Sequence, residues 1–395
     1  MSKGMLLRPL LVILLGLIPP LLVAADKPQL YSGTLGKMAI VVELDLSDPA
    51  QVSGRYFYRK YRHDLALNGS LDGVQLSLGE GRERYDDTPR PELHLQPTPQ
   101  GWQGEWRGEQ GKRLPIRLRK ALIEEPPAGA EPFWYRLYEQ SPYEFLRLKG
   151  MPLKPGKRQH FMGHELQWWS EPASGVAFFE VLDGYPQVQL DRINQALRER
   201  LWQEVISYHA CKLNAGTDWS EFQQTVTPRL LSAAIVSLSI LTSYDCGGAH
   251  PDFGDAPLTL NAQTGEPLGL EDLLWVGEGP AFLYREARGQ EVDGESVSFE
   301  VFSRYRNQHL APWLVEQWRR IAPGDIPASG GEDVECNYGD PYLWDYPSWY
   351  LSDKGMVFDP IFPRVARACE GTEWSILPYA LVKQHPGRLN LSLPE

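Results

Sequence analysis

The sequence YDCGGAHP at residues 244–251, followed by LTLNAQTGEPLGLEDLL at residues 258–274, decides the fold of the second half of this chain. An alternating apolar run leads into a glycine turn that carries His250, and a second short strand then breaks at Thr264-Gly265. An acidic pair next opens a short Leu-Leu segment. Strand, glycine turn and strand in this order predict antiparallel strands joined by tight turns.

Further periodic segments surround this stretch. Apolar residues at three- and four-residue intervals predict an amphipathic helix over residues 190–208. Residues 231–244 alternate as a strand does, and the segment from residue 133 to 181 is expected to be strand-rich. Beyond the stretch we expect helices over residues 281–288 and 301–320, two short strands within residues 349–358, and a closing strand and turn at residues 374–381.

The N-terminal part is rich in period-two runs separated by Gly, Asn or Asp turns. Asn68-Gly69 and Asp72-Gly73 are hairpin signals, so residues 31–120 are expected to form an antiparallel β-meander, either a small sheet or a half-barrel. The overall expectation is an α+β fold. Its parts are a signal peptide at residues 1–25, an antiparallel β domain at 26–121, a proline-rich linker at 122–132, and a mixed helix and antiparallel sheet domain at 133–395.

The first residues have the layout of a secretory signal peptide. Lys3 and Arg8 precede an apolar run over residues 10–23, and cleavage is expected after Ala25. An uncleaved anchor is the less favoured alternative, because the run is short for a membrane span and contains two prolines. We therefore expect a periplasmic protein, with secretion as the alternative, and no stable membrane span after cleavage.

The charge of the chain restricts its partners. The formal net charge is −12, and loss of Lys3 and Arg8 with the leader lowers it by two more, to −14. Such acidity disfavours nucleic acid and anionic lipid as partners, whereas it tolerates a basic protein.

All four cysteines lie in the C-terminal half: Cys211, Cys246, Cys336 and Cys369. An oxidising compartment would favour two disulfides, for which three pairings are possible. We favour Cys211 with Cys246 and Cys336 with Cys369, because each pair closes a loop of moderate length. No two cysteines are spaced closely enough to form a zinc ligand pair.

Five elements in the right order resemble the RsiV-like C-terminal domain family, a domain of unknown function shared with the lysozyme-sensing anti-sigma factor RsiV and the peptidoglycan deacetylase PdaC. They are the helix, CGGAHP at 246–251, the Thr-Gly hairpin with LEDL at 270–273, LSDKGMVF at 351–358 and WSILPY at 374–379. The resemblance spans residues 181–384. The cysteines and a long insert at residues 322–347 depart from the family pattern.

This resemblance implies a binding or sensing module. The deacetylase activity found within the family belongs to a separate catalytic domain without a counterpart in this sequence, so no enzyme activity carries over. RsiV-like domains bind lysozyme, which is strongly basic. Anti-sigma factors need a transmembrane helix to pass a signal inward, so direct transcriptional control is not expected here.

His250 is the residue that most invites a catalytic reading. Two glycines precede it and could expose its imidazole, and Asp245 or Asp252 could orient it. The favoured alternative is structural: a histidine at a strand end commonly hydrogen-bonds a neighbouring carbonyl and fixes the turn. No Gly-x-Ser-x-Gly nucleophile motif accompanies it.

His160 and His164 stand four residues apart, a spacing that on a helix could bind zinc. The preceding basic run, Gly163 and the following Trp168-Trp169 fit a loop and strand better. His-Glu-x-x-His, EF-hand, phosphate-loop and dinucleotide motifs are absent from the sequence, so we expect no metal and no cofactor.

Residues 332–350 mix carboxylates with aromatic rings beside a cysteine. Interfaces favour Tyr and Trp, and carboxylates steer a cationic partner, so this segment is the candidate contact surface. The alternative is that the aromatic residues cover the sheet while the acids are solvated. The candidate binding residues are His250, Asp252, Asp340, Tyr342, Trp344 and Asp345.

The resulting expectation is a non-catalytic binding or sensing protein of the cell envelope, whose partner is a basic cell-wall enzyme such as lysozyme, or peptidoglycan. The rival hypothesis is a cell-wall hydrolase or deacetylase that uses His250 with Asp245 or Asp252. Loss of an activity in His250→Ala without loss of the fold would favour the rival.

Overall fold

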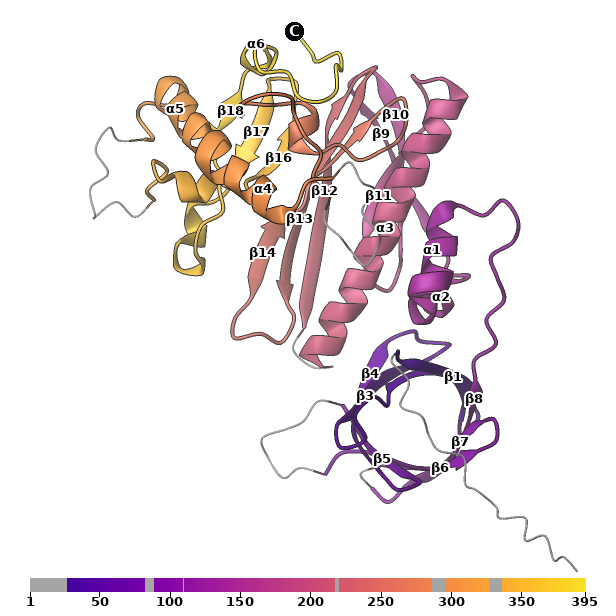
Figure 1. Cartoon of the computed structure of the whole chain (residues 1–395). Coiled ribbons are helices and arrows are strands. Elements are labelled where there is room, and N and C mark those ends of the chain that lie inside the picture. The colour runs from indigo at the N-terminus through magenta and orange to yellow at the C-terminus, as the bar shows by residue number, and fades with distance from the viewer. Residues whose placement is uncertain (1–26, 82–88, 109, 217–219, 286–295, 327–335) are drawn as a thin grey trace, which may run out of the picture. The chain divides into compact units, whose positions relative to one another are not determined.

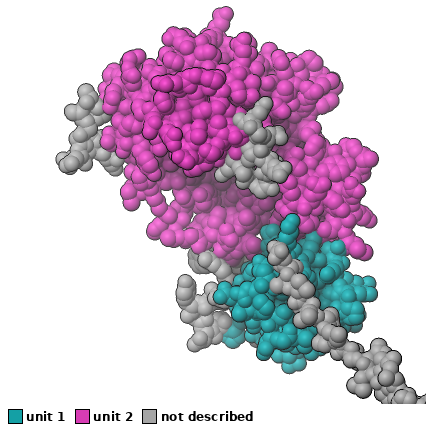
Figure 2. All heavy atoms as spheres, viewed as in Figure 1, with its two compact units in different colours: residues 1–56, 66–121 teal, residues 57–65, 122–395 magenta. Residues whose placement is uncertain are grey.

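The computed structural model describes residues 27–81, 89–108, 110–216, 220–285, 296–326 and 336–395 (Figure 1). The expected signal peptide lies outside these residues. The chain combines helices with antiparallel sheets, which confirms the α+β prediction. It divides into two compact units (Figure 2): residues up to Tyr56 with Ala66–Ala121, and Phe57–Leu65 with Leu122–Glu395.

The N-terminal strands form a closed antiparallel barrel. They are β1 Gln29–Leu35, β2 Met38–Asp45, β3 Val52–Tyr58, β4 Asp64–Asp72, β5 Gln75–Glu80, β6 Glu92–Thr98, β7 Gly101–Arg107 and β8 Arg113–Lys120. The sequence suggested a sheet or half-barrel; the structure closes it, because β1 pairs with both β2 and β8. Gly33 permits the closure, since a Cβ there would lie 1.9 Å from the carbonyl oxygen of Arg117.

The barrel is filled by the inward half of each alternating strand. Val42, Leu44, Leu67, Leu76 and Leu95 are all buried. Each such side chain contributes about 1.5–3 kcal/mol relative to an exposed one. The period-two pattern therefore sets which face of most strands is inside, whereas β2 departs from it because Ile40, Val41 and Val42 are all buried.

The second unit begins with two short helices, α1 Pro132–Gln140 and α2 Pro142–Leu148. The sequence-based expectation of a strand-rich start was wrong for these residues. Each helix has a proline in its first turn, where the missing N–H has no intrahelical partner to lose. The expected strands follow as a sheet of order β11-β10-β9, formed by β9 Lys154–Phe161, β10 His164–Ser170 and β11 Ala177–Val181.

A long helix and a four-stranded sheet form the centre of this unit. The expected amphipathic helix is α3 Gln187–Ala215, and Ile193, Leu197 and Val205 on it are fully buried. The sheet contains β12 Glu221–Leu231, β13 Ile235–Asp245, β14 Asp252–Asp255 and β15 Leu258–Asn261. Both β14 and β15 pair with β13, one after the other along its edge. The helix packs against β11, β12 and β13 and closes one core with them (Figure 1).

The C-terminal elements enclose a second core around Trp318 and Trp344. They are α4 Phe299–Tyr305, a short π-helix Arg306–Leu310, α5 Ala311–Ile321, β16 Ser348–Leu351, β17 Met356–Asp359, β18 Ile376–Leu377 and α6 Tyr379–Val382. The helix predicted over residues 301–320 and the strand pair within residues 349–358 are confirmed.

The helix expected over residues 281–288 is absent from the described part, residues 281–285. Leu283 forms an isolated bridge with Ser296 instead. The Phe282 ring packs edge-on against Trp275 and Tyr305, with centroids 4.8 and 5.4 Å away, so this short segment is held extended by tertiary packing.

Two disulfides join Cys211 to Cys246 and Cys336 to Cys369, the pairing favoured from loop length. The first ties the last turns of α3 to the end of β13. Disulfides are typical of exported proteins. Among the described residues, no helix is both long and apolar enough to cross a membrane.

Candidate functional site

A groove lined by both polar and apolar side chains runs along α3 in the second unit. It consists of two adjoining pockets of ≈ 600 and ≈ 630 Å³. Their walls share Arg200, Gln203, Pro257, Thr259 and Leu268, which makes them one continuous depression. The α3 residues that line it extend from residue 192 to residue 207, a length of about 22 Å at the rise of an α-helix.

Charged side chains on the helix wall are paired with each other. Arg136 and Glu199 form an ion pair at 2.5 Å, and the amide of Gln203 donates to the same carboxylate at 3.2 Å. Arg200 pairs with Glu204 at 2.6 Å and also donates to the carbonyl of Ala256 at 2.8 Å. These contacts hold the long side chains in place and leave the groove almost neutral.

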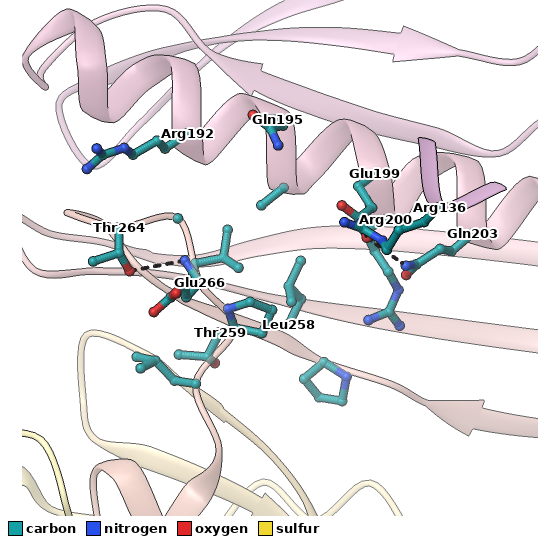
Figure 3. Close-up of a pocket in the computed structure, with 16 residues that line it drawn as sticks. Arg136, Arg192, Gln195, Glu199, Arg200, Gln203, Leu258, Thr259, Thr264 and Glu266 are labelled. Carbon is teal, nitrogen blue, oxygen red and sulfur yellow. Dashed lines mark hydrogen bonds and ion pairs between the residues drawn. The ribbon is translucent and has the colours of Figure 1, made fainter. Parts of the chain in front are cut away.

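The opposite wall of the first pocket is the Thr-Gly hairpin that the sequence singled out. Figure 3 shows Thr264 and Glu266 facing the α3 side chains across the pocket. Gly265 has φ of +74°, and a Cβ there would lie 2.8 Å from the carbonyl oxygen of Arg192 on α3. Glycine is therefore required at this position for two reasons: the positive φ of the turn and the close approach to the helix. Arg192 in turn donates to the carbonyl of Gln263 at 3.0 Å.

The second pocket is lined by the carboxylate of Asp255 and by two aromatic residues. Asp255 accepts a hydrogen bond from the backbone N–H of Ile240 at 2.8 Å. Burial raises the pKa of Asp255, while this hydrogen bond and the nearby guanidinium groups oppose the rise. Tyr346, Trp349 and Ile361 form the wall away from α3.

An exposed aromatic patch adjoins this end of the groove; we define it as Phe299, Tyr342, Tyr346 and Ile361. Phe299 is 58% exposed and Tyr342 is 71% exposed. The rings of Phe299 and Tyr346 are stacked with centroids 6.3 Å apart, and Ile361 donates its backbone N–H to the carbonyl of Leu343, next to Tyr342. Phe299 and Tyr346 therefore stack directly, while Tyr342 is placed near Ile361 through the backbone of its neighbour Leu343. Exposed aromatic side chains are enriched at protein-binding surfaces.

The structure places His250 on the surface. Within the described residues its imidazole forms no hydrogen bond or ion pair, either with a carbonyl or with Asp245 or Asp252. Asp252 instead pairs with Arg367 at 3.0 Å, and Asp245 accepts the N–H of Gly247 at 3.1 Å. The three side chains therefore do not form a catalytic constellation in this structure.

The four candidate residues of the aromatic segment fall into different environments. Asp340 is exposed and caps a 3₁₀ turn by accepting from the N–H of Tyr342. Trp344 is fully buried in the second core and donates to the carbonyl of Tyr338 at 3.0 Å, so it cannot contact a partner. Asp345 is buried too, and burial raises its pKa. Of the four, Tyr342 and Asp340 are available on the surface; residues 332–335 lie outside the described residues.

His160 and His164 lie on strands and not on a helix. The side chain of His160 contacts Glu165 at 3.2 Å, while the His164 ring stacks on Tyr185 at 5.0 Å. Over the described ranges, no group of three or more His, Cys, Asp or Glu side chains is arranged to hold a metal ion.

The groove was not anticipated from the sequence. Its helix wall carries polar residues at intervals of three and four, among them Gln195, Glu199 and Gln203, and such a stripe on an amphipathic helix normally faces water. The presence of amides and paired charges on that stripe was the available signal.

Comparison with known proteins gives little. No protein-family model matches the chain, and no curated protein matches it. Among solved structures it is similar to the crystal structure of a member of the DUF3298 family from Bacteroides fragilis, with 14% identity and a TM-score of 0.34 over 60% of this chain and 92% of that chain. A similarity of this size assigns neither a fold nor an activity, and the RsiV-like relationship of the second unit stays a prediction.

Proposed function

We propose that this protein is an exported, periplasmic binding or sensing module of the cell envelope, with an RsiV-like second unit that recognises a basic cell-wall enzyme such as lysozyme. The observation that carries the proposal is the exposed aromatic patch. Phe299 and Tyr342 present large rings to solvent at little cost in side-chain entropy, as binding hot spots do.

Charge supports a cationic partner. The exposed carboxylate of Asp340 lies two residues before Tyr342, and that of Glu300, next to Phe299, is also exposed and pairs with Arg304 at 2.8 Å. The net charge of the chain after loss of the leader, −14, adds a long-range attraction for a basic protein. Such attraction acts mainly on the rate of association and weakens as salt is added.

The test is binding of the full chain to a panel of immobilised basic muralytic enzymes, including lysozyme, at low and high salt. We expect salt-sensitive retention by at least one enzyme. Tyr342→Ala and Phe299→Ala should each weaken it by about 2 kcal/mol, or about 30-fold. Tyr61→Ala is the matched control, because Tyr61 is 51% exposed and lies outside the patch.

Retention that is unchanged in both patch variants would remove the patch from the proposal. Absence of retention by every enzyme at low salt would remove the basic partner itself.

A further inference from the structure

The groove along α3 adjoins the aromatic patch and shares Tyr346 and Ile361 with it, whereas Phe299 and Tyr342 do not line the groove. The walls of the groove combine charged and amide side chains with apolar ones, and the charged groups are close to balanced, with three arginines and four carboxylates. We propose that this groove binds a linear, hydroxyl-rich glycan. The proposal does not depend on the protein partner, because it is carried by the geometry of α3, the hairpin at Thr264 and the strand at Trp349.

Charge balance favours a ligand without large net charge. Arg136, Arg192 and Arg200 face the groove together with Glu199, Glu204, Glu266 and Asp255. Two of the arginines are already in ion pairs with glutamates of α3. A strongly anionic or cationic ligand would have to break such pairs, whereas hydroxyl groups can bond to either partner without breaking them.

Unused hydrogen-bonding capacity remains on these side chains. A guanidinium has five N–H donors and a carboxylate accepts about four hydrogen bonds, so each ion pair still offers donors and acceptors. Gln195 forms no side-chain hydrogen bond within the described residues, and the carbonyl oxygen of Gln203 is likewise uncommitted there. Fixed donors and acceptors along a helix are suited to the many hydroxyl groups of a sugar chain.

The backbone of the hairpin wall of the first pocket does not suit an extended peptide. Peptides commonly bind by adding a strand to a free sheet edge. The outer edge of β15 is already occupied, because Asn261 donates to the carbonyl of Glu266 at 2.9 Å and Leu268 donates to the carbonyl of Thr259 at 2.8 Å. A strand edge for peptide addition is therefore missing at this wall.

Aromatic side chains close one end of the groove. Trp349 is half-buried and lines the second pocket beside Tyr346. A partly exposed indole ring provides a flat apolar surface of the kind that the C–H face of a sugar ring packs against. The groove extends for about 22 Å along α3, which is long enough to hold several sugar rings in a row.

The experiment is isothermal titration calorimetry of the full chain with three probes: chitohexaose, cellohexaose, and an uncharged Ser/Thr-rich peptide of similar length. We expect saturable binding of at least one oligosaccharide and none of the peptide. The double variant Gln195→Ala/Gln203→Ala should weaken the oligosaccharide by at least about tenfold, since two hydrogen bonds are lost. Trp349→Ala should weaken it too.

Gln189→Ala is the control, because Gln189 lies on α3 outside both pockets. Circular dichroism of each variant establishes that the fold is retained. Binding of the peptide alone, binding of neither oligosaccharide, or oligosaccharide binding that the Gln195/Gln203 double variant leaves unchanged would each overturn the proposal. None of these outcomes affects the enzyme-retention assay, whose variants, Phe299→Ala and Tyr342→Ala, do not line the groove.

Discussion

Arg147 offers the sharpest test of the structure, because it is a fully buried cation. Its guanidinium pairs with the carboxylate of Asp64 and, at 2.8 Å, with that of Glu144. It also donates to the carbonyl of Arg62 at 2.8 Å. All four residues belong to the second unit, which includes Phe57–Leu65.

The magnitude follows from what a substitution leaves behind. The side chains of Asp64 and Glu144 are 0% and 8% exposed, so Arg147→Ala removes the cation and leaves two desolvated carboxylates. Breaking a buried ion pair on one side costs about 3–5 kcal/mol. Arg147→Lys should also lose stability, because one ammonium cannot reproduce the fork that serves both carboxylates and the carbonyl.

The assay is urea unfolding followed by tryptophan fluorescence. The matched control is Arg158→Ala, since the Arg158 side chain is 70% exposed and its contact with Glu165 is 3.8 Å long. We expect less than about 1 kcal/mol of change there. The triple variant Arg147→Met/Asp64→Asn/Glu144→Gln should recover part of the loss, because no buried charge remains. A loss below about 1 kcal/mol for Arg147→Ala would refute the reasoning that these charges are buried and mutually dependent.

Two further predictions concern the disulfides and pH. The pairs Cys211–Cys246 and Cys336–Cys369 have sequence separations of 35 and 33. Loop entropy therefore predicts that replacing either pair by serine lowers the free energy of unfolding by about 4 kcal/mol. Chemical denaturation of both double variants measures this loss. Clearly different losses in the two variants would argue against an origin in loop length. Burial raises the pKa of Asp359 above the ordinary value of an aspartate, helped by neighbouring carboxylates and opposed by two backbone N–H donors. A raised folded-state pKa adds stability below the unfolded pKa and loses it as pH rises through the folded pKa. The parent should therefore lose stability relative to Asp359→Asn as the pH rises from about 3 to about 7. A difference in the free energy of unfolding between variant and parent that is the same at both pH values would contradict this.

Local patterns predicted those elements whose stability is decided nearby in the chain. The spacing of Leu190, Ile193 and Leu197 predicted α3, because a helix of regular period must bury one stripe. Alternation before Cys246 predicted β13, and the moderate length of the loops between cysteines favoured the disulfide pairing that the structure shows. By contrast, the sequence reading missed α1 and α2 although Pro132 and Pro142 marked their first turns. At Phe282 the error has another cause, because tertiary packing decides the conformation there.

The candidate sites depended much more on tertiary structure. The acidic and aromatic segment read as one surface in the sequence, yet Trp344 lies in the core while Tyr342, two residues earlier, is 71% exposed. A short irregular turn has no fixed period, so spacing cannot tell which of its rings is buried.

By itself, the sequence determined the two kinds of architecture, the long helix, the main strands, the disulfide pairing it favoured and the glycine-marked hairpin. Only the tertiary structure decided that the barrel closes and that a groove exists. β1 and β8 pair although most of the N-terminal unit separates them along the sequence, and Gly265 contacts the backbone of Arg192, which lies more than seventy residues earlier. Periodicity records which side of an element is buried, whereas a groove depends on which distant elements face each other, and that is set by long-range packing.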